Sequence, residues 1–244
     1  MDLQSVWTVS LKEFKIFLKR PTIIYTTVVP PILLGIALPL YLGHAVARSA
    51  IETMASSGRI DGFLFFLAAL AVTLPTTIAS YSLVGEKIQK TLEPLLATPV
   101  SDGEILLGKF VSAILPPILA VYAGATIFMA LIDQSTYSVL GYLFFPNWNA
   151  ALILLVLAPL GSVSAVELNV ILSARMNDPR AVQQLGAILV LPFLGIFVAA
   201  LDGYISVDTS SLLVICAIVF AAAVALFYLS KAAFRREEIL TRWK

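Results

Sequence analysis

The segment GEILLGK, residues 103–109, has the G-x-x-x-x-G-K spacing of a phosphate-binding loop. The next residue is Phe110, whereas such a loop continues with a Ser or Thr whose hydroxyl holds Mg²⁺. No strand is predicted before the segment, and its middle is an apolar helical run rather than a loop with free amide groups. We therefore expect no nucleotide site and no ATPase activity in this chain.

Glu167 is the only charged residue well inside a long apolar run. By helical rise it lies roughly 10–12 Å from Arg175, at the edge of that run. An ionisable group at such depth is costly, so it indicates a proton site, a cation site or a substrate contact. We favour the other interpretation, a structural carboxyl that is protonated or hydrogen-bonded to Asn169, Gln183, Gln184 or a neighbouring helix end. A second copy of the chain is another source of a partner.

A second apolar run carries a row of hydroxyl side chains at helical spacing, and Pro75 lies among them. These hydroxyl residues are Thr73, Thr76, Thr77 and Ser80. Such a face can line a substrate pathway, but hydroxyls in membrane helices more often bond to their own helix or to a neighbour. Pro75 also frees a carbonyl that they can serve. We interpret the face as a packing surface, with a pathway as the alternative.

Other catalytic and metal-binding chemistry has little support. The single Cys (Cys216) and the single His (His44) cannot form an internal disulfide or build a metal site from Cys and His alone. Gly161-Ser162 is reminiscent of a membrane serine nucleophile, but His44 lies near the outer end of another apolar run, which argues against a Ser–His pair. A net charge of +1 excludes a general nucleic-acid-binding surface.

The composition is that of an integral membrane protein, with 59% hydrophobic and 13% charged residues. In lipid each span must satisfy its own backbone, and no alternating strands are seen, so we predict an all-α protein rather than a barrel. Residues 134–148 are expected to form an outer loop, with a short interfacial helix as an option within it. Residues 21–232 are expected to form one domain with six spans at about 21–44, 62–85, 108–132, 149–174, 181–201 and 209–231.

Lys and Arg predict the orientation of these spans. With both termini inside, every one of the 16 Lys and Arg residues is cytoplasmic except Arg48 and Arg59. Residues 233–244 then form a cytoplasmic tail. Residues 1–20 are predicted to form an amphipathic helix in the membrane interface, with Lys12, Lys15 and Lys19 opposite an apolar sector. That sector consists of Leu3, Trp7, Leu11, Phe14 and Leu18.

The cytoplasmic segment 86–107 is long for a connection between two antiparallel helices. Leu92, Leu95 and Leu96 recur at helical spacing, so a short helix there would expose leucines that need a partner surface. After a turn, Ser101 followed by Glu104 predicts a capping box that begins the next helix.

The sequence EKIQKTLEPLLATPVSDGEILLGK, residues 86–109, resembles the cytoplasmic loop of ABC-2-type transporter permeases, the membrane subunits of ATP-driven exporters. The segment SARMNDPRAVQQ, residues 173–184, is similar to the part of these permeases that enters the fifth span. Lys90 departs from the pattern, because the family often has Gly there. With the span count and the amphipathic first helix, the resemblance covers essentially the whole chain.

This resemblance implies that the segment is a coupling helix, which seats in a groove of a separate ABC ATPase and transmits its closure on ATP to the spans. It implies two ATPase copies that carry ATP and Mg²⁺, a second permease copy in a homodimer, and export across the plasma membrane, with no cofactor on this chain. The coupling residues that it implies are Glu86, Lys87, Thr91, Leu92, Glu93, Leu95, Leu96 and Pro99.

An ion- or proton-coupled secondary transporter that uses Glu167 is the alternative function. It would need no ATPase, but it leaves the leucines of residues 92–96 unexplained and lacks a pair of corresponding broken helices. A structural or regulatory scaffold is a third possibility.

Overall fold

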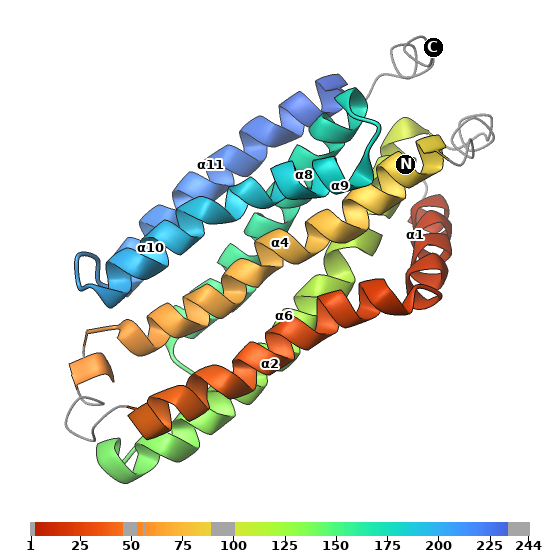
Figure 1. The fold of residues 1–244 in the computed structure, drawn as a ribbon. Coiled ribbons are helices and arrows are strands. Elements are labelled where there is room, and N and C mark those ends of the chain that lie inside the picture. Colours follow the sequence, from red (N-terminus) through yellow and green to blue (C-terminus); the bar gives the residue numbers. More distant parts are fainter. Residues whose placement is uncertain (1–2, 46–52, 56, 89–100, 234–244) are drawn as a thin grey trace.

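The computed structural model describes residues 3–45, 53–55, 57–88 and 101–233 (Figure 1). The described part is helical without strands, which confirms the predicted all-α membrane protein. Within the described ranges, six helical segments have the length and apolarity of a membrane span, as predicted. They are Pro21–Gly43, Arg59–Ser82, Gly103–Leu140, Trp148–Arg175, Pro179–Leu201 and Thr209–Lys231.

The spans lie side by side, and α1 turns across one end of the bundle (Figure 1). We call this the α1 end; the last turn of α4, the start of α6, the α8–α9 junction and the last turns of α11 also lie there. The helices are α1 (Leu3–Leu18), α2 (Pro21–Ala45), α4 (Arg59–Ile88), α6 (Asp102–Leu140), α7 (Trp148–Leu152), α8 (Ala158–Arg175), α9 (Pro179–Ala187), α10 (Leu191–Leu201) and α11 (Thr209–Ala233).

Helix α4 is the centre of the bundle and packs against α2, α6, α8, α9 and α10. In its most apolar stretch 78% of the residues are buried, against 22% in α2 and 17% in α11. The outer helices therefore present apolar side chains that lipid or another chain must cover. Their backbones approach closely where side chains are small: a Cβ added to Gly124 of α6 would collide with the carbonyl of Pro31 in α2.

Proline in α4 explains how α8 is seated. Pro75 has no N–H, so the carbonyl of Ala71, four residues earlier, lacks its helical donor. The Ser162 hydroxyl of α8 lies 2.7 Å from that carbonyl oxygen. Gly161 permits this approach, because a Cβ there would lie 2.8 Å from Val72. The Gly-Ser pair that resembles a nucleophile site therefore has a packing role.

Two further helix interruptions lie in the fourth and fifth spans. A π-helical turn, Ile153–Leu157, joins α7 to α8 just before Pro159, and the Tyr122 hydroxyl of α6 donates to the Leu154 carbonyl within that turn at 2.9 Å. A 3₁₀ turn, Ile188–Val190, joins α9 to α10 just before Pro192. Each interruption precedes a proline that cannot donate to the preceding turn.

The third span differs from its predicted bounds of 108–132. Helix α6 begins at Asp102 and continues to Leu140, so residues 134–140, which we placed in an outer loop, are helical. Ser135 and Thr136 are compatible with the helix because their hydroxyls donate to carbonyls one turn back, at 2.8 Å each. Gly141, with φ of 74°, then ends the helix in the left-handed conformation.

The Pro75–Ser162 contact predicts a thermodynamic coupling between two helices. Ser162→Ala should lower the free energy of unfolding by about 1 kcal/mol, because the Ala71 carbonyl loses its donor. In a Pro75→Ala background the restored N–H serves that carbonyl, so the same change should cost much less. Unfolding in mixed micelles measures both values.

Ser164→Ala is the matched control, because the Ser164 hydroxyl is equally buried but bonds to Leu160 of its own helix. It should cost the same in both backgrounds. Equal costs of Ser162→Ala in the two backgrounds would contradict the assigned role of Ser162.

Candidate functional site

The predicted coupling residues Thr91, Leu92, Glu93, Leu95, Leu96 and Pro99 lie outside the described residues. Glu86 and Lys87 lie in the last turn of α4, which ends at Ile88. On the other side, Ser101 begins α6 as predicted: its hydroxyl accepts from the Glu104 N–H at 3.4 Å, and its own N–H donates to Glu104 Oε2 at 2.9 Å. This confirms the capping box. The helices that flank the segment are therefore defined.

Helix α1 joins these two flanking helices through buried charges. Lys109 of α6 and Glu13 of α1 are 3% and 8% exposed, and Lys109 Nζ lies 3.7 Å from Glu13 Oε1. The Ser82 hydroxyl of α4 donates to Glu13 Oε2 at 3.0 Å. Lys109 Nζ donates to the Ser82 hydroxyl and carbonyl oxygens, at 3.1 Å each. We call Glu13, Ser82 and Lys109 the junction cluster.

Close packing brings these charges together. A Cβ added to Gly108 would lie 2.8 Å from the side chain of Val9, so only glycine lets α1 come this near to α6. The Ser10 hydroxyl of α1 lies 3.0 Å from the Gly108 carbonyl oxygen. Gly108 and Lys109, which give residues 103–109 their phosphate-loop spacing, therefore lie in a helix and hold α1 in place.

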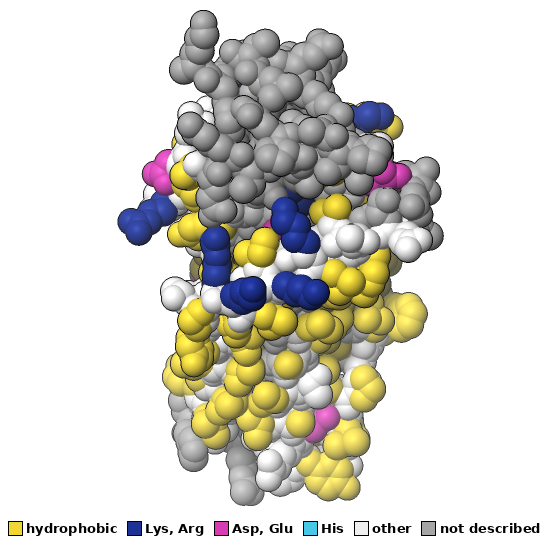
Figure 2. Space-filling model, turned by 90° about the vertical axis from the view of Figure 1, so that its right-hand side faces the viewer, with side chains coloured by type: hydrophobic (Ala, Val, Ile, Leu, Met, Phe, Trp, Pro, Cys, Tyr) yellow, Lys and Arg dark blue, Asp and Glu magenta, His cyan; other side chains and the backbone are white. Residues whose placement is uncertain are grey.

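Helix α1 has three different sides. Its buried side consists of Val9, Ser10, Glu13 and Phe17. Three residues of the predicted apolar sector face away from the protein: Trp7 is 55%, Leu11 39% and Leu18 67% exposed. Lys12, Lys15 and Lys19 are also exposed. Figure 2, which views the bundle from the side that carries α1, shows Lys and Arg side chains gathered in a band above a broad hydrophobic face.

Glu167 lies inside the bundle without a polar partner. Its side chain is 2% exposed, and its Oε2 makes no hydrogen bond with the described residues. The amides considered as partners bond elsewhere or face outward. Asn169 donates to the Ala165 carbonyl and Gln183 donates to Thr77, at 2.8 Å each. Gln184 is exposed. None of these three amides therefore bonds to Glu167, and a neutral carboxyl or a partner from a second copy stays a prediction. A carboxyl in this setting is costly unless it is neutral or another group pairs with it.

The hydroxyl face of α4 is occupied by hydrogen bonds to helices. Thr73, Thr76 and Ser80 donate to carbonyls three residues back in α4, at 3.2, 2.6 and 3.1 Å. Thr77 accepts from Gln183 of α9 at 2.8 Å. These contacts are those of packing groups, and a place in a substrate pathway stays a prediction.

A polar network that the sequence analysis missed joins three helix starts at the opposite end. Asp61, 3% exposed, accepts from the amides of Asn147 and Asn149 at 2.9 Å each. Thr209 at the start of α11 donates to Asn149 at 2.8 Å. A cavity of about 350 Å³ opens beside the network. The described residues contain no group of His, Cys, Asp and Glu side chains suited to a metal ion.

Asp208, which lines the same cavity, caps the start of α11. Its carboxylate accepts from the Ser211 N–H at 3.1 Å and from the Ser210 hydroxyl at 2.7 Å. Hydrogen bonds from Ser211 and Ser210 lower the pKa of Asp208 to about 2. The cap therefore stays ionised at neutral pH and favours the helix start.

Comparison with known protein families supports a membrane transporter. A family model described as "ABC-2 family transporter protein" matches residues 7–195, well over half of the chain. The matched region extends from α1 into α10 and includes the junction cluster and Glu167. No curated protein gives a significant match to the sequence.

The junction cluster predicts that its charges depend on each other. Lys109→Met leaves the Glu13 carboxylate buried without its cation, and should lower the free energy of unfolding by about 3–5 kcal/mol. Glu13→Gln should act similarly by leaving the ammonium unpaired. The double variant removes both charges, so it should lose far less than the sum of the single changes.

Thermal unfolding in detergent measures these effects. Lys15→Met, which removes an exposed cation from α1, serves as the control and should leave the unfolding temperature unchanged. Additive losses in the double variant would show that the two charges do not interact.

Proposed function

The chain belongs to the ABC-2 family of transporter proteins, and we propose that it is the permease subunit of an ATP-driven exporter. A multi-pass membrane component of a transporter follows from the family and from the six membrane-spanning helices. Our proposal adds that the chain forms the translocation pathway and that ATP hydrolysis by a separate ABC ATPase drives transport through it. That partner would act in two copies and carry ATP and Mg²⁺, with no cofactor on this chain.

The main structural support for coupling to an ATPase is the junction cluster. The proposed coupling residues, 86–99, begin in the last turn of α4 and precede α6 in the sequence. Glu13, Ser82 and Lys109 connect these two helices to each other and to α1. Because breaking a buried charge pair is expensive, a displacement of the coupling segment would move the three helices together rather than bend one of them.

The lengths of α4 and α6 let such a displacement reach the other side of the membrane. Helix α4 runs from the α1 end to the polar network at Asp61, and α6 spans residues Asp102–Leu140. Pro75 in α4 and Pro116-Pro117 in α6 supply points at which the helices can bend. We infer that closure of the ATPases would shift α4, the most buried helix, relative to its neighbours, and so alternate access to the pathway.

The proposed orientation places the α1 end in the cytoplasm. The last turns of α4 and α11, the start of α6 and the α8–α9 junction all lie there. Together with residues 12–20, these regions carry nine of the 16 Lys and Arg residues. In the plasma membrane this arrangement presents residues 86–99 and both termini to cytoplasmic partners. A second permease copy would complete the pathway as a homodimer, because one chain supplies a single six-span half.

Glu167 carries the alternative function, an ion- or proton-coupled secondary transporter. The observation that favours it is the buried Oε2 without a partner among the described residues. The permease proposal instead assigns Glu167 a structural role as a neutral carboxyl within the bundle.

The proposed contact with the ATPase can be tested by mutation. Replacing Leu92, Leu95 and Leu96 together by Asp should abolish co-purification of the cognate ABC ATPase, because charges would enter an apolar groove. Tyr142→Asp with Leu143→Asp is the control, since these residues are 57% and 63% exposed at the opposite end of the bundle. Intact ATPase binding by the triple variant would overturn the coupling assignment.

The second prediction separates the two functions. In proteoliposomes with an imposed pH gradient and an enclosed pH dye, the wild type and Glu167→Gln should both admit protons no faster than empty vesicles. A proton flux in the wild type that Glu167→Gln abolishes would favour the secondary transporter instead.

A further inference from the structure

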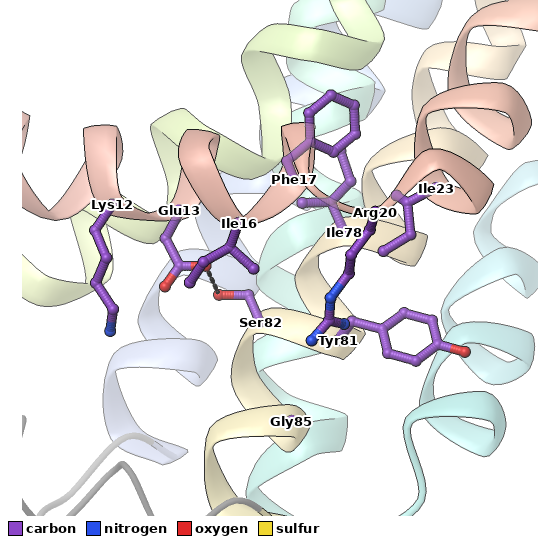
Figure 3. A pocket seen from close by; sticks show the side chains of 10 residues that line it. All are labelled: Lys12, Glu13, Ile16, Phe17, Arg20, Ile23, Ile78, Tyr81, Ser82 and Gly85. Carbon is purple, nitrogen blue, oxygen red and sulfur yellow. Dashed lines mark hydrogen bonds between the residues drawn. The ribbon is translucent and has the colours of Figure 1, made fainter.

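A cavity of about 190 Å³ lies between α1, the start of α2 and the last third of α4 (Figure 3). Arg20 lines it and directly precedes the first span, which begins at Pro21. Tyr81 and Ser82 line the other side, where the second span ends. The cavity therefore lies at the boundary between the hydrocarbon and the polar layer, on the side of the bundle that carries the basic band of Figure 2.

The polar wall of the cavity is positively charged. Arg20 is half-buried, and within the described part of the chain its guanidinium makes no hydrogen bond or ion pair. Lys12 contributes a second cation to the wall. Glu13 is the acidic residue of the lining, but its carboxylate already accepts from the Ser82 hydroxyl (Figure 3). It also pairs with Lys109. The charge left for a ligand is that of the Arg20 guanidinium.

The remaining wall is apolar and continues toward the hydrocarbon. Ile16, Ile23 and Ile78 line the cavity, and the last two belong to a packed apolar cluster with Phe17. Gly85 contributes no side chain, and a Cβ there would have no atom within 4 Å, so the mouth stays open. By the liquid volume of water, about 30 Å³ per molecule, the cavity holds roughly six waters. It therefore suits a phosphate group and its nearest substituents, but no acyl chain.

We propose that this cavity binds the headgroup phosphate of an anionic phospholipid. The Arg20 guanidinium donates to the phosphate oxygens, because its planar set of N–H groups matches them. The acyl chains stay in the hydrocarbon beside the isoleucines. Anionic headgroups concentrate cations of this kind at the cytoplasmic surface of a membrane. The bound lipid would pack α1 against α4 next to the junction cluster, and this inference does not depend on an ATPase partner.

Thermal unfolding of the purified full chain in a neutral detergent tests the proposal. Added phosphatidylglycerol should raise the unfolding temperature more than the same amount of phosphatidylcholine does. Arg20→Gln should remove at least half of this difference. Lys19→Gln is the matched control, because it removes the same charge from the adjacent residue, which is exposed and does not line the cavity.

A second variant tests the cavity without changing any charge. Gly85→Leu places a side chain in the open mouth and should reduce the phosphatidylglycerol effect as Arg20→Gln does. It also keeps the test valid if Arg20→Gln fails to fold. Native mass spectrometry should show one retained phosphatidylglycerol per wild-type chain and at least a twofold lower occupancy in either variant.

Two results would overturn the proposal. The first is an equal phosphatidylglycerol effect in the wild type and in both Arg20→Gln and Gly85→Leu. The second is stabilisation of the wild type by inorganic phosphate or glycerol 3-phosphate to the same extent as by phosphatidylglycerol, which would assign the cavity to a soluble phosphate compound.

Discussion

The hydrocarbon of a membrane offers no hydrogen-bond partner to a peptide group, so the protein must satisfy every backbone polar group in its spans from within. This constraint accounts for the helical spans and also for how they touch. Where Pro75 leaves the Ala71 carbonyl without its donor, Ser162 of another helix supplies one. Tyr122 likewise reaches the Leu154 carbonyl before Pro159. Proline therefore sets contacts between helices as well as breaks within them.

Burying a charged side chain costs even more than burying a peptide group, and two buried acidic residues of this protein differ in how that cost is offset. Glu13 and Lys109 are buried together, with Ser82 between them, so each charge has partners from another helix. Such a cluster fixes where α1 lies on α4 and α6, since any other placement would separate the charges. Glu167 is also buried, but the described residues give its Oε2 no partner. The junction cluster therefore has the contacts of a structural connection. The unpartnered Oε2 is the reason why Glu167 is considered as a functional group.

The α1 end gathers the features that a permease needs for communication with its surroundings. The junction cluster fixes the helices on both sides of the proposed coupling segment, while the cavity at Arg20 faces the polar layer of the membrane. Both sites share Ser82 and Glu13. In our proposals, force from the ATPase and contact with an anionic lipid therefore meet at one short stretch of α4, which is the most buried helix of the bundle.

The sequence by itself determined the features that depend on local composition. Residue type and spacing are enough to predict the six apolar runs, the Ser101–Glu104 capping box and the two unlike exposed sides of α1. Tertiary structure alone decided which distant residues meet. In the sequence Glu13 and Lys109 resemble ordinary charges near the ends of spans, and Asn147 and Asn149 resemble part of a helix break. Nothing local indicates that each has a partner nearly one hundred residues away. The end of α6 was also misjudged, because the uncharged run stops at Asp133. In the structure the helix continues past Asp133, whose carboxylate accepts from the N–H groups of Phe144 and Phe145.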